Sequence, residues 1–207
     1  VTFNYANSIY FYNGSGIMTS LTDMVNPNLD ASFPVLLALD GASIGHAVVC
    51  DGYGYNYSTS YHHLNMGWDG NQDAWYNLPD VEASPYTFNC VDTCVYNVFT
   101  STAGEIISGR VIDMAGYPIP GAAVSAESAY YGTYQASTDN NGIYALAGLP
   151  SSHSFTVSVQ MSGHAFPEQI ISTGTSQDYS SVSGNVWGVD FQSQNASPPT
   201  AYSSNQT

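Results

Sequence analysis

Short alternating strands separated by turn-forming residues fill the second half of the sequence. Val111 begins one strand, Gly116 and Pro118 turn the chain, and a second strand returns over Ala122 to Ser128. Asn140-Asn141-Gly142 can adopt the positive φ angles that a hairpin turn requires. Strands at such regular spacing are typical of a β-sandwich, and we expect about seven of them.

The chain divides near residue 102. Residues 1–101 have irregular apolar runs and contain all three cysteines, whereas the stretch Ser101 to Glu105 is small and polar like a linker. We predict one domain over residues 1–101 and a β-sandwich over residues 104–192. The polar tail, residues 193–207, has the composition of a disordered segment.

The charge balance excludes several classes of partner. Sixteen acidic residues stand against one cation, Arg110, so the net charge is −15. Such a surface repels nucleic acid and anionic lipid. No apolar run approaches the ~20 residues of a membrane helix, so we expect no membrane insertion. Seventeen tyrosines and frequent Gly and Pro favour a mainly β, turn-rich fold.

The first residue is Val1, and no charged-then-apolar leader follows it. This start predicts a mature, secreted, extracellular protein whose signal or upstream region has been removed. Asn-x-Ser/Thr sequons are possible glycosylation sites, although several such matches arise by chance in a chain rich in Asn and Ser. The four sequons begin at Asn13, Asn56, Asn195 and Asn205.

A predicted hairpin brings a histidine and an asparagine together. Its strands are His46 to Tyr53 and Tyr61 to Met66, joined by Gly54 to Tyr57. In this register His46 lies opposite Asn65, at a Cβ separation of ~4.5–5.5 Å. The asparagine oxygen would then fix one imidazole nitrogen and leave the other to accept a proton from a thiol.

The residues around this hairpin resemble the streptopain family of papain-like cysteine peptidases. The matching pieces, within roughly residues 30 to 100, are GHAVVCDGY, LNMGWDG and DAWYNL. The resemblance implies a partial papain-like β lobe in which His46 is the general base, Asn65 orients it, and Trp68 forms a wall beside the site. Met66 stands where the family usually has Trp, which implies a weaker apolar shield.

The family's nucleophilic cysteine lies well upstream of the histidine, and no such residue occurs in this sequence. Cys50 is four residues from His46 on the same strand, so ~13 Å away. Cys90 and Cys94 flank a predicted tight turn, which indicates either a structural disulfide or two buried thiols. We therefore expect a base without a nucleophile.

Possible metal sites are few. Asp69, Asn71, Asp73 and Asp80 have the spacing of calcium ligands, but the same residues also fit an ordinary turn. Adjacent histidines, His62 and His63, point to opposite faces of a strand and do not easily share a metal. No C-x-x-C-H motif for covalent haem is present. Calcium is thus the one cofactor that the sequence suggests.

The second half resembles the carboxypeptidase regulatory-like domain, a transthyretin-like β-sandwich. Gly109 to Val124 and Thr138 to Pro150 carry the matching motifs. The resemblance implies a seven-stranded sandwich that serves as an extracellular spacer or attachment module.

Two functions are compatible with these features. The chain is either a catalytically incomplete C-terminal portion of a secreted streptopain-like peptidase that acts as an extracellular assembly subunit, for example of a filament, or it is an active endopeptidase when combined with an upstream Cys-bearing segment. The predicted partners are accordingly a second copy of the chain or that upstream segment.

Overall fold

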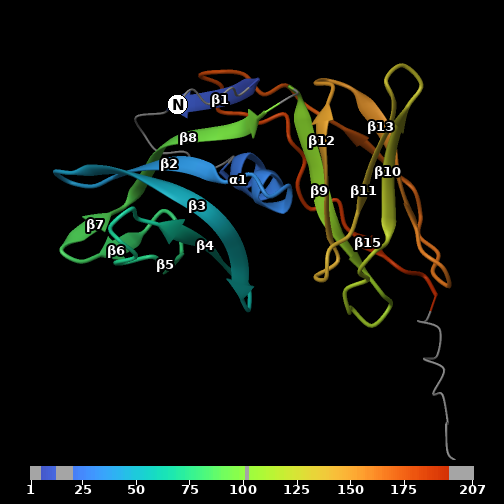
Figure 1. Ribbon diagram of the computed structural model, residues 1–207, viewed down its shortest axis with the longest axis horizontal. Coiled ribbons are helices and arrows are strands. Elements are labelled where there is room, and N and C mark those ends of the chain that lie inside the picture. Colours follow the sequence, from blue (N-terminus) through green and yellow to red (C-terminus); the bar gives the residue numbers. More distant parts are fainter. Residues whose placement is uncertain (1–5, 13–20, 101–102, 196–207) are drawn as a thin grey trace, which may run out of the picture.

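The computed structural model describes residues 6–12, 21–100 and 103–195, and it is mainly β, as predicted (Figure 1). We call the described residues up to Thr100 the first unit and those from residue 103 onward the second unit. The first unit contains β1 (Asn7–Tyr12), α1 (Leu21–Asp30), β2 (Val35–Asp40), β3 (Gly45–Asn56), β4 (Thr59–Asn65), β5 (Ala74–Tyr76), β6 (Val81–Ala83), β7 (Tyr86–Phe88) and β8 (Cys90–Phe99). The second contains β9 (Glu105–Ile112), β10 (Ala123–Ser128), β11 (Gly132–Ser137), β12 (Ile143–Leu149), β13 (Ser154–Gln160), β14 (Gln169–Ser172) and β15 (Phe191–Gln192).

A six-stranded sheet, in the order β1-β8-β2-β3-β4-β5, organises the first unit. Alternate residues of its strands point to opposite faces. Leu37 and Val48 point to the face that α1 covers with Met24 and Val25, and all four are buried. We call this the covered face. Leu36 points to the other, open face and remains 51% exposed.

The second unit is the predicted β-sandwich. A four-stranded sheet, β11-β10-β13-β14, packs against a three-stranded one, β12-β9-β15, which gives seven strands. Buried residues alternate along β10 and β13, such as Val124 and Val157. Gly109 is needed on β9 because a Cβ there would collide with the carbonyl of Val189. The final strand, β15, is short: Phe191 and Gln192 pair with β9 in parallel, and Val186 adds an isolated parallel bridge to Ile107.

The domain boundary near residue 102 remains a prediction, because residues 101–102 lie outside the described residues. Of the predicted tail, only residues 193–195 are described. The two units nevertheless share buried polar contacts, and α1 lies between the sheet and strands β9 and β12 (Figure 1).

Paired asparagines form the centre of this junction. The amide of Asn185 donates to Oδ1 of Asn97 at 2.9 Å, and the amide of Asn97 donates back to Asn185 at 3.1 Å. Asn185 Oδ1 also accepts the backbone N–H of Ile106 at 2.9 Å. Pro27 has no N–H, so the carbonyl of Asp23 lacks its helical donor. The Asn185 amide lies 3.3 Å from that carbonyl and supplies the bond.

A second contact joins the units through Asp30 at the end of α1. The hydroxyl of Tyr53 donates to Asp30 Oδ1 at 2.8 Å, and Nε1 of Trp187 donates to the Tyr53 oxygen at 3.3 Å. Burial raises the pKa of the Asp30 carboxyl to about 6, and the charges of Asp139 and Asp190 add to this effect. A carboxylate is also unfavourable at the C-terminal end of a helix.

We expect Asn185→Ala to lower the free energy of unfolding by about 3 kcal/mol, because the buried groups that it pairs lose their partners. Chemical denaturation monitored by circular dichroism measures the loss. Asn195→Ala, which removes an exposed amide, serves as the control and should change stability by less than about 0.5 kcal/mol. Equal effects of the two variants would contradict a central role for the junction.

We also expect the pH dependence of stability to reveal Asp30. An acid whose folded-state pKa exceeds its unfolded value binds its proton more tightly in the folded state, so stability falls as the pH rises from about 4 to about 6. Asp30→Asn should remove that decrease and stabilise the protein near pH 7 by about 1–3 kcal/mol. Thermal melts across this pH range test the effect, with Glu168→Gln as an exposed control. A wild-type decrease that persists in Asp30→Asn would refute the assignment.

Candidate active site

His46 lies near the start of β3 and points to the covered face, opposite Leu39 of β2. Its imidazole stacks on the indole of Trp68, with ring centroids 4.7 Å apart and planes inclined by 29°. The ring of Phe88 lies at 6.2 Å. Trp68 therefore lies directly beside the histidine.

A backbone carbonyl fixes the orientation of the imidazole. Nε2 of His46 lies 2.8 Å from the carbonyl oxygen of Met66. A carbonyl oxygen only accepts hydrogen bonds, so Nε2 must carry the proton and Nδ1 keeps its lone pair. This tautomer leaves Nδ1 as the basic atom of the site.

The predicted contact between His46 and Asn65 is wrong. Asn65 pairs with Val49, on the open face, and its Oδ1 accepts the backbone N–H of Gly67 at 2.9 Å. The predicted loop is shorter than expected, because β3 and β4 continue through it to a tight turn at Tyr57 and Ser58, which shifts the register. A bulge between Cys50 and Gly52 shifts the register a second time. Each register shift changes which residues face one another. The carbonyl of Met66, one residue beyond Asn65, takes the orienting role.

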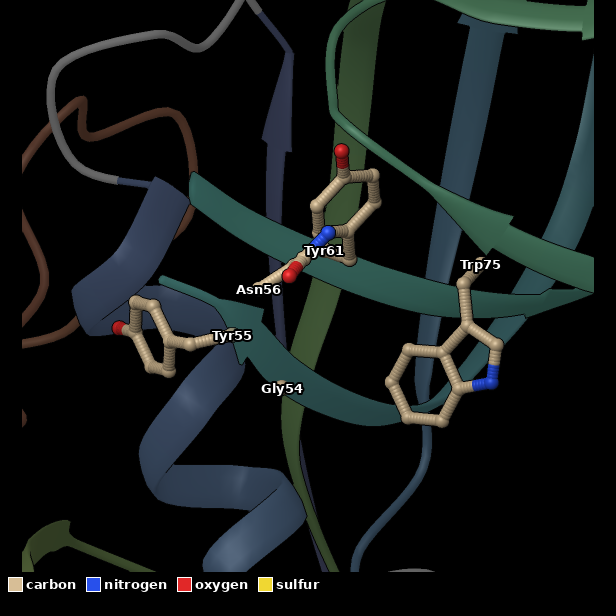
Figure 2. A pocket seen from close by; sticks show the side chains of 5 residues that line it. All are labelled: Gly54, Tyr55, Asn56, Tyr61 and Trp75. Carbon is tan, nitrogen blue, oxygen red and sulfur yellow. The ribbon is translucent and has the colours of Figure 1, made fainter. Parts of the chain in front are cut away.

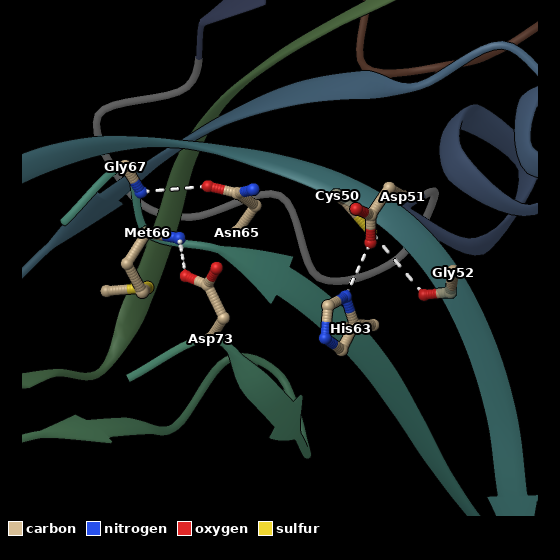
Figure 3. A network of polar contacts seen from close by, with 8 residues as sticks. All are labelled: Cys50, Asp51, Gly52, His63, Asn65, Met66, Gly67 and Asp73. Carbon is tan, nitrogen blue, oxygen red and sulfur yellow. Dashed lines mark hydrogen bonds and ion pairs between the residues drawn. The ribbon is translucent and has the colours of Figure 1, made fainter. Parts of the chain in front are cut away.

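Asp73 holds the backbone of Met66 in place. Its Oδ1 accepts the Met66 N–H at 2.8 Å (Figure 3). The Met66 carbonyl in turn contacts His46. The side chain of Met66 is only 1% exposed. The sequence offers Asp73 as a calcium ligand only, but Asp73 also begins the streptopain-like motif DAWYNL, and that motif is the signal for its role beside Met66.

None of the three cysteines is placed to react with His46. Cys50 is buried on the covered face, ~13 Å along β3 from His46. Burial raises the pKa of its thiol to about 12 and raises that of Cys94 as well. Cys90 pairs with Asp40, whose side chain is on the open face, so the side chain of Cys90 points to the open face as well. None of these three thiols therefore lies beside His46.

Of the two alternatives for Cys90 and Cys94, the disulfide is wrong. Both thiols are free and lie on one continuous strand, β8, where a turn was expected. Four residues of extended strand separate their Cα atoms by ~13 Å, and a disulfide needs less than about 7 Å. The alternative of unpaired thiols holds, with Cys94 buried and Cys90 partly so.

Two of the predicted calcium ligands, Asp69 and Asn71, lie in a tight turn. Asp69 and Gln72 have positive φ angles of 53° and 64°, and the Asn71 amide donates to the carbonyl of Trp68, so the segment has the form of a tight turn. Within the described ranges, no group of three or more His, Cys, Asp or Glu side chains gathers. Calcium at Asp69, Asn71, Asp73 and Asp80 remains a prediction.

The adjacent histidines contact different elements. His62 is buried against α1, where Nε2 lies 3.0 Å from Asn26 Oδ1, and burial lowers its pKa to about 4. His63 points to the open face, where Nδ1 lies 2.6 Å from Asp51 Oδ1. They do not share a site.

Two parts of the sequence match the models of known protein families. Residues 1–76 match the model of the Peptidase C10 family. The first unit is peptidase-derived. The Peptidase C10 family is the streptopain family, and the matched residues include His46, Trp68 and Asp73. Residues 106–182 match the carboxypeptidase regulatory-like domain. Both resemblances seen in the sequence are thus confirmed.

No curated protein matches the chain. Members of the Peptidase C10 family are generally secreted. None of the helices in the described part of the chain has the length and apolar character needed to cross a bilayer.

We expect Asn65→Ala to leave the His46 tautomer unchanged, because Asn65 contacts Gly67 and not the imidazole. Long-range proton–nitrogen NMR spectra at alkaline pH should show Nε2 protonated in both proteins. Asp73→Ala, which releases the Met66 backbone, should increase the population of the other tautomer. A change in Asn65→Ala equal to that in Asp73→Ala would contradict this geometry.

Proposed function

We propose that the first unit is the base-bearing half of a streptopain-like cysteine peptidase site, and that it is catalytically incomplete until a cysteine from another segment reaches His46. One observation carries the proposal: the bond from His46 Nε2 to the Met66 carbonyl directs a basic Nδ1 away from its anchor, beside the Trp68 ring. This is the arrangement that a thiol nucleophile requires.

The chemistry follows from that tautomer. A thiol within hydrogen-bond reach of Nδ1 transfers its proton to the imidazole, and the thiolate attacks the carbonyl carbon of a peptide bond. The imidazolium then gives the proton to the leaving amine as the carbon–nitrogen bond breaks. Water, deprotonated by the same imidazole, hydrolyses the thioester. The Met66 carbonyl keeps the ring in place throughout and stabilises its protonated form.

A second role, as an extracellular assembly subunit such as a filament subunit, is favoured by the open face. A groove of about 420 Å³ lies there, lined by Phe33, Pro34, Val35, Leu36, Val49, Val98 and Thr100. Leu36 in it is 51% exposed. Exposed apolar patches commonly mark interfaces. In this role a second copy of the chain covers the groove, and the regulatory-like sandwich serves as a spacer.

Thiol labelling distinguishes the two roles. We expect the isolated chain to have no peptidase activity and to show no labelling by thiol-directed peptidase probes that depends on His46. In native material, the peptidase role requires rapid labelling of a cysteine outside the present sequence, and His46→Ala should slow it at least about 100-fold. His63→Ala, which alters an imidazole on the open face, is the matched control.

His46-dependent labelling of Cys50, Cys90 or Cys94 in the isolated chain would overturn the proposed division of the site. Intact mass and sedimentation of native material complete the test. A mass equal to that of this sequence, in a large homogeneous assembly, would replace the peptidase role with the assembly role.

A further inference from the structure

An aromatic pocket lies on the first unit, well away from His46. It has a volume of about 480 Å³ and is lined by Gly54, Tyr55, Asn56, Tyr61 and Trp75 (Figure 2). Eight residues of β3 separate Gly54 from His46, which corresponds to ~26 Å. Trp75 pairs with His63 and thus belongs to the open face, whereas His46 points to the covered face. The pocket is therefore separate from the candidate active site.

The indole of Trp75 is exposed and yet firmly mounted. It is 54% exposed and lies across β3 beside Gly54 (Figure 2). A Cβ on Gly52 or Gly54 would lie 3.4 Å or 3.6 Å from its six-membered ring, so the glycines let the ring lie close to the backbone. The ring centroids of His63 and Trp75 lie 5.3 Å apart, and the His63 imidazole is itself held by a contact from Nδ1 to Asp51 Oδ1. The strand thus supports one side of the indole, and the other side faces solvent.

Neutral polar groups stand beside this ring. The Asn56 amide and the Tyr61 hydroxyl make no hydrogen bond to another described residue. Tyr55 lines the rim, and Figure 2 shows its ring pointing away from Trp75. None of the five lining residues is charged. The pocket therefore offers a flat apolar surface with uncharged donors and acceptors at its edge.

These properties select the class of ligand. The net charge of −15 disfavours an anion. A cation would gain from the aromatic rings, but none of the lining residues is a carboxylate, and the neighbouring Asp51 is engaged with His63. A pyranose ring has an apolar face of C–H groups and a rim of hydroxyls, which matches an indole face bordered by an amide and a hydroxyl. We propose that the Trp75 pocket binds a neutral saccharide, with its C–H face on the indole and its hydroxyls on Asn56 and Tyr61.

The saccharide has two possible sources. It is either a free oligosaccharide or a glycan attached to Asn56, because Asn56-Tyr57-Ser58 is a sequon at the turn of the β3–β4 hairpin. Tyr57 in that turn is 98% exposed, so the sequon is accessible. Either source presents the same C–H face to the indole and hydroxyls to Tyr61, whereas Asn56 is a hydrogen-bond partner of a free sugar and the attachment point of a covalent glycan.

Titration of the full chain with neutral oligosaccharides tests the proposal. The probes are β-1,4-linked glucose and N-acetylglucosamine oligomers and α-1,4-linked glucose oligomers, each to about 10 mM. The Trp75 indole N–H resonance reports binding, and calorimetry gives the affinity. We expect at least one probe to bind and Trp75→Ala to weaken it about tenfold or more. Tyr130→Ala, which removes an 88% exposed ring in the second unit, should leave binding unchanged.

Further variants keep the test decisive. If Trp75→Ala does not fold, Tyr61→Phe and Asn56→Ala should each weaken binding about 2- to 10-fold. Intact mass of native material, compared with Ser58→Ala, identifies an attached glycan, whereas binding of free sugar to unmodified chain identifies the other source. The proposal is overturned if no saccharide shifts the Trp75 resonance in the unmodified chain and native material lacks a glycan. It is also overturned if binding survives in Trp75→Ala, or if only choline or a lysine-rich peptide binds.

Discussion

The paired amides of Asn97 and Asn185 are the interaction on which the arrangement of the two units depends. Asn97 has a positive φ of 50°, a conformation that asparagine tolerates better than most residues. Its Oδ1 also accepts the amide of Asn28 at 3.1 Å, so α1, β8 and the second unit meet at one side chain. Buried amides are costly to leave unpaired, and this cost favours a single relative placement of the units.

Strand β3 contributes to two candidate sites because its residues alternate between faces and because a bulge interrupts it. Upstream of the bulge, His46 points to the covered face and is enclosed by Trp68 and Phe88. Downstream, Gly52 and Gly54 have no side chains, and the indole of Trp75 occupies the space on the open face. One strand therefore supports a partly enclosed basic imidazole and, at its other end, an exposed aromatic pocket.

The orientation of His46 depends on the backbone of a neighbouring residue. Met66 is fixed on one side by Asp73 and on the other by the imidazole. A carbonyl acceptor imposes the same tautomer that an asparagine oxygen would impose, because neither can donate to Nε2. The side chain of Asn65 is consequently free to stabilise the turn at Gly67.

The sequence by itself determined the mainly β fold, the seven-stranded sandwich and the family model that each half matches, since these follow from local alternation, turn residues and ordered motifs. It also placed His46 and Trp68 together. Tertiary structure decided the partner of His46, the continuous strand that keeps Cys90 and Cys94 apart, and the asparagine junction between the units. Register depends on turn length and on bulges, and a shift of one residue moves a side chain to the other face. Neither feature has a reliable local signature, so only the folded sheet fixed which residues meet.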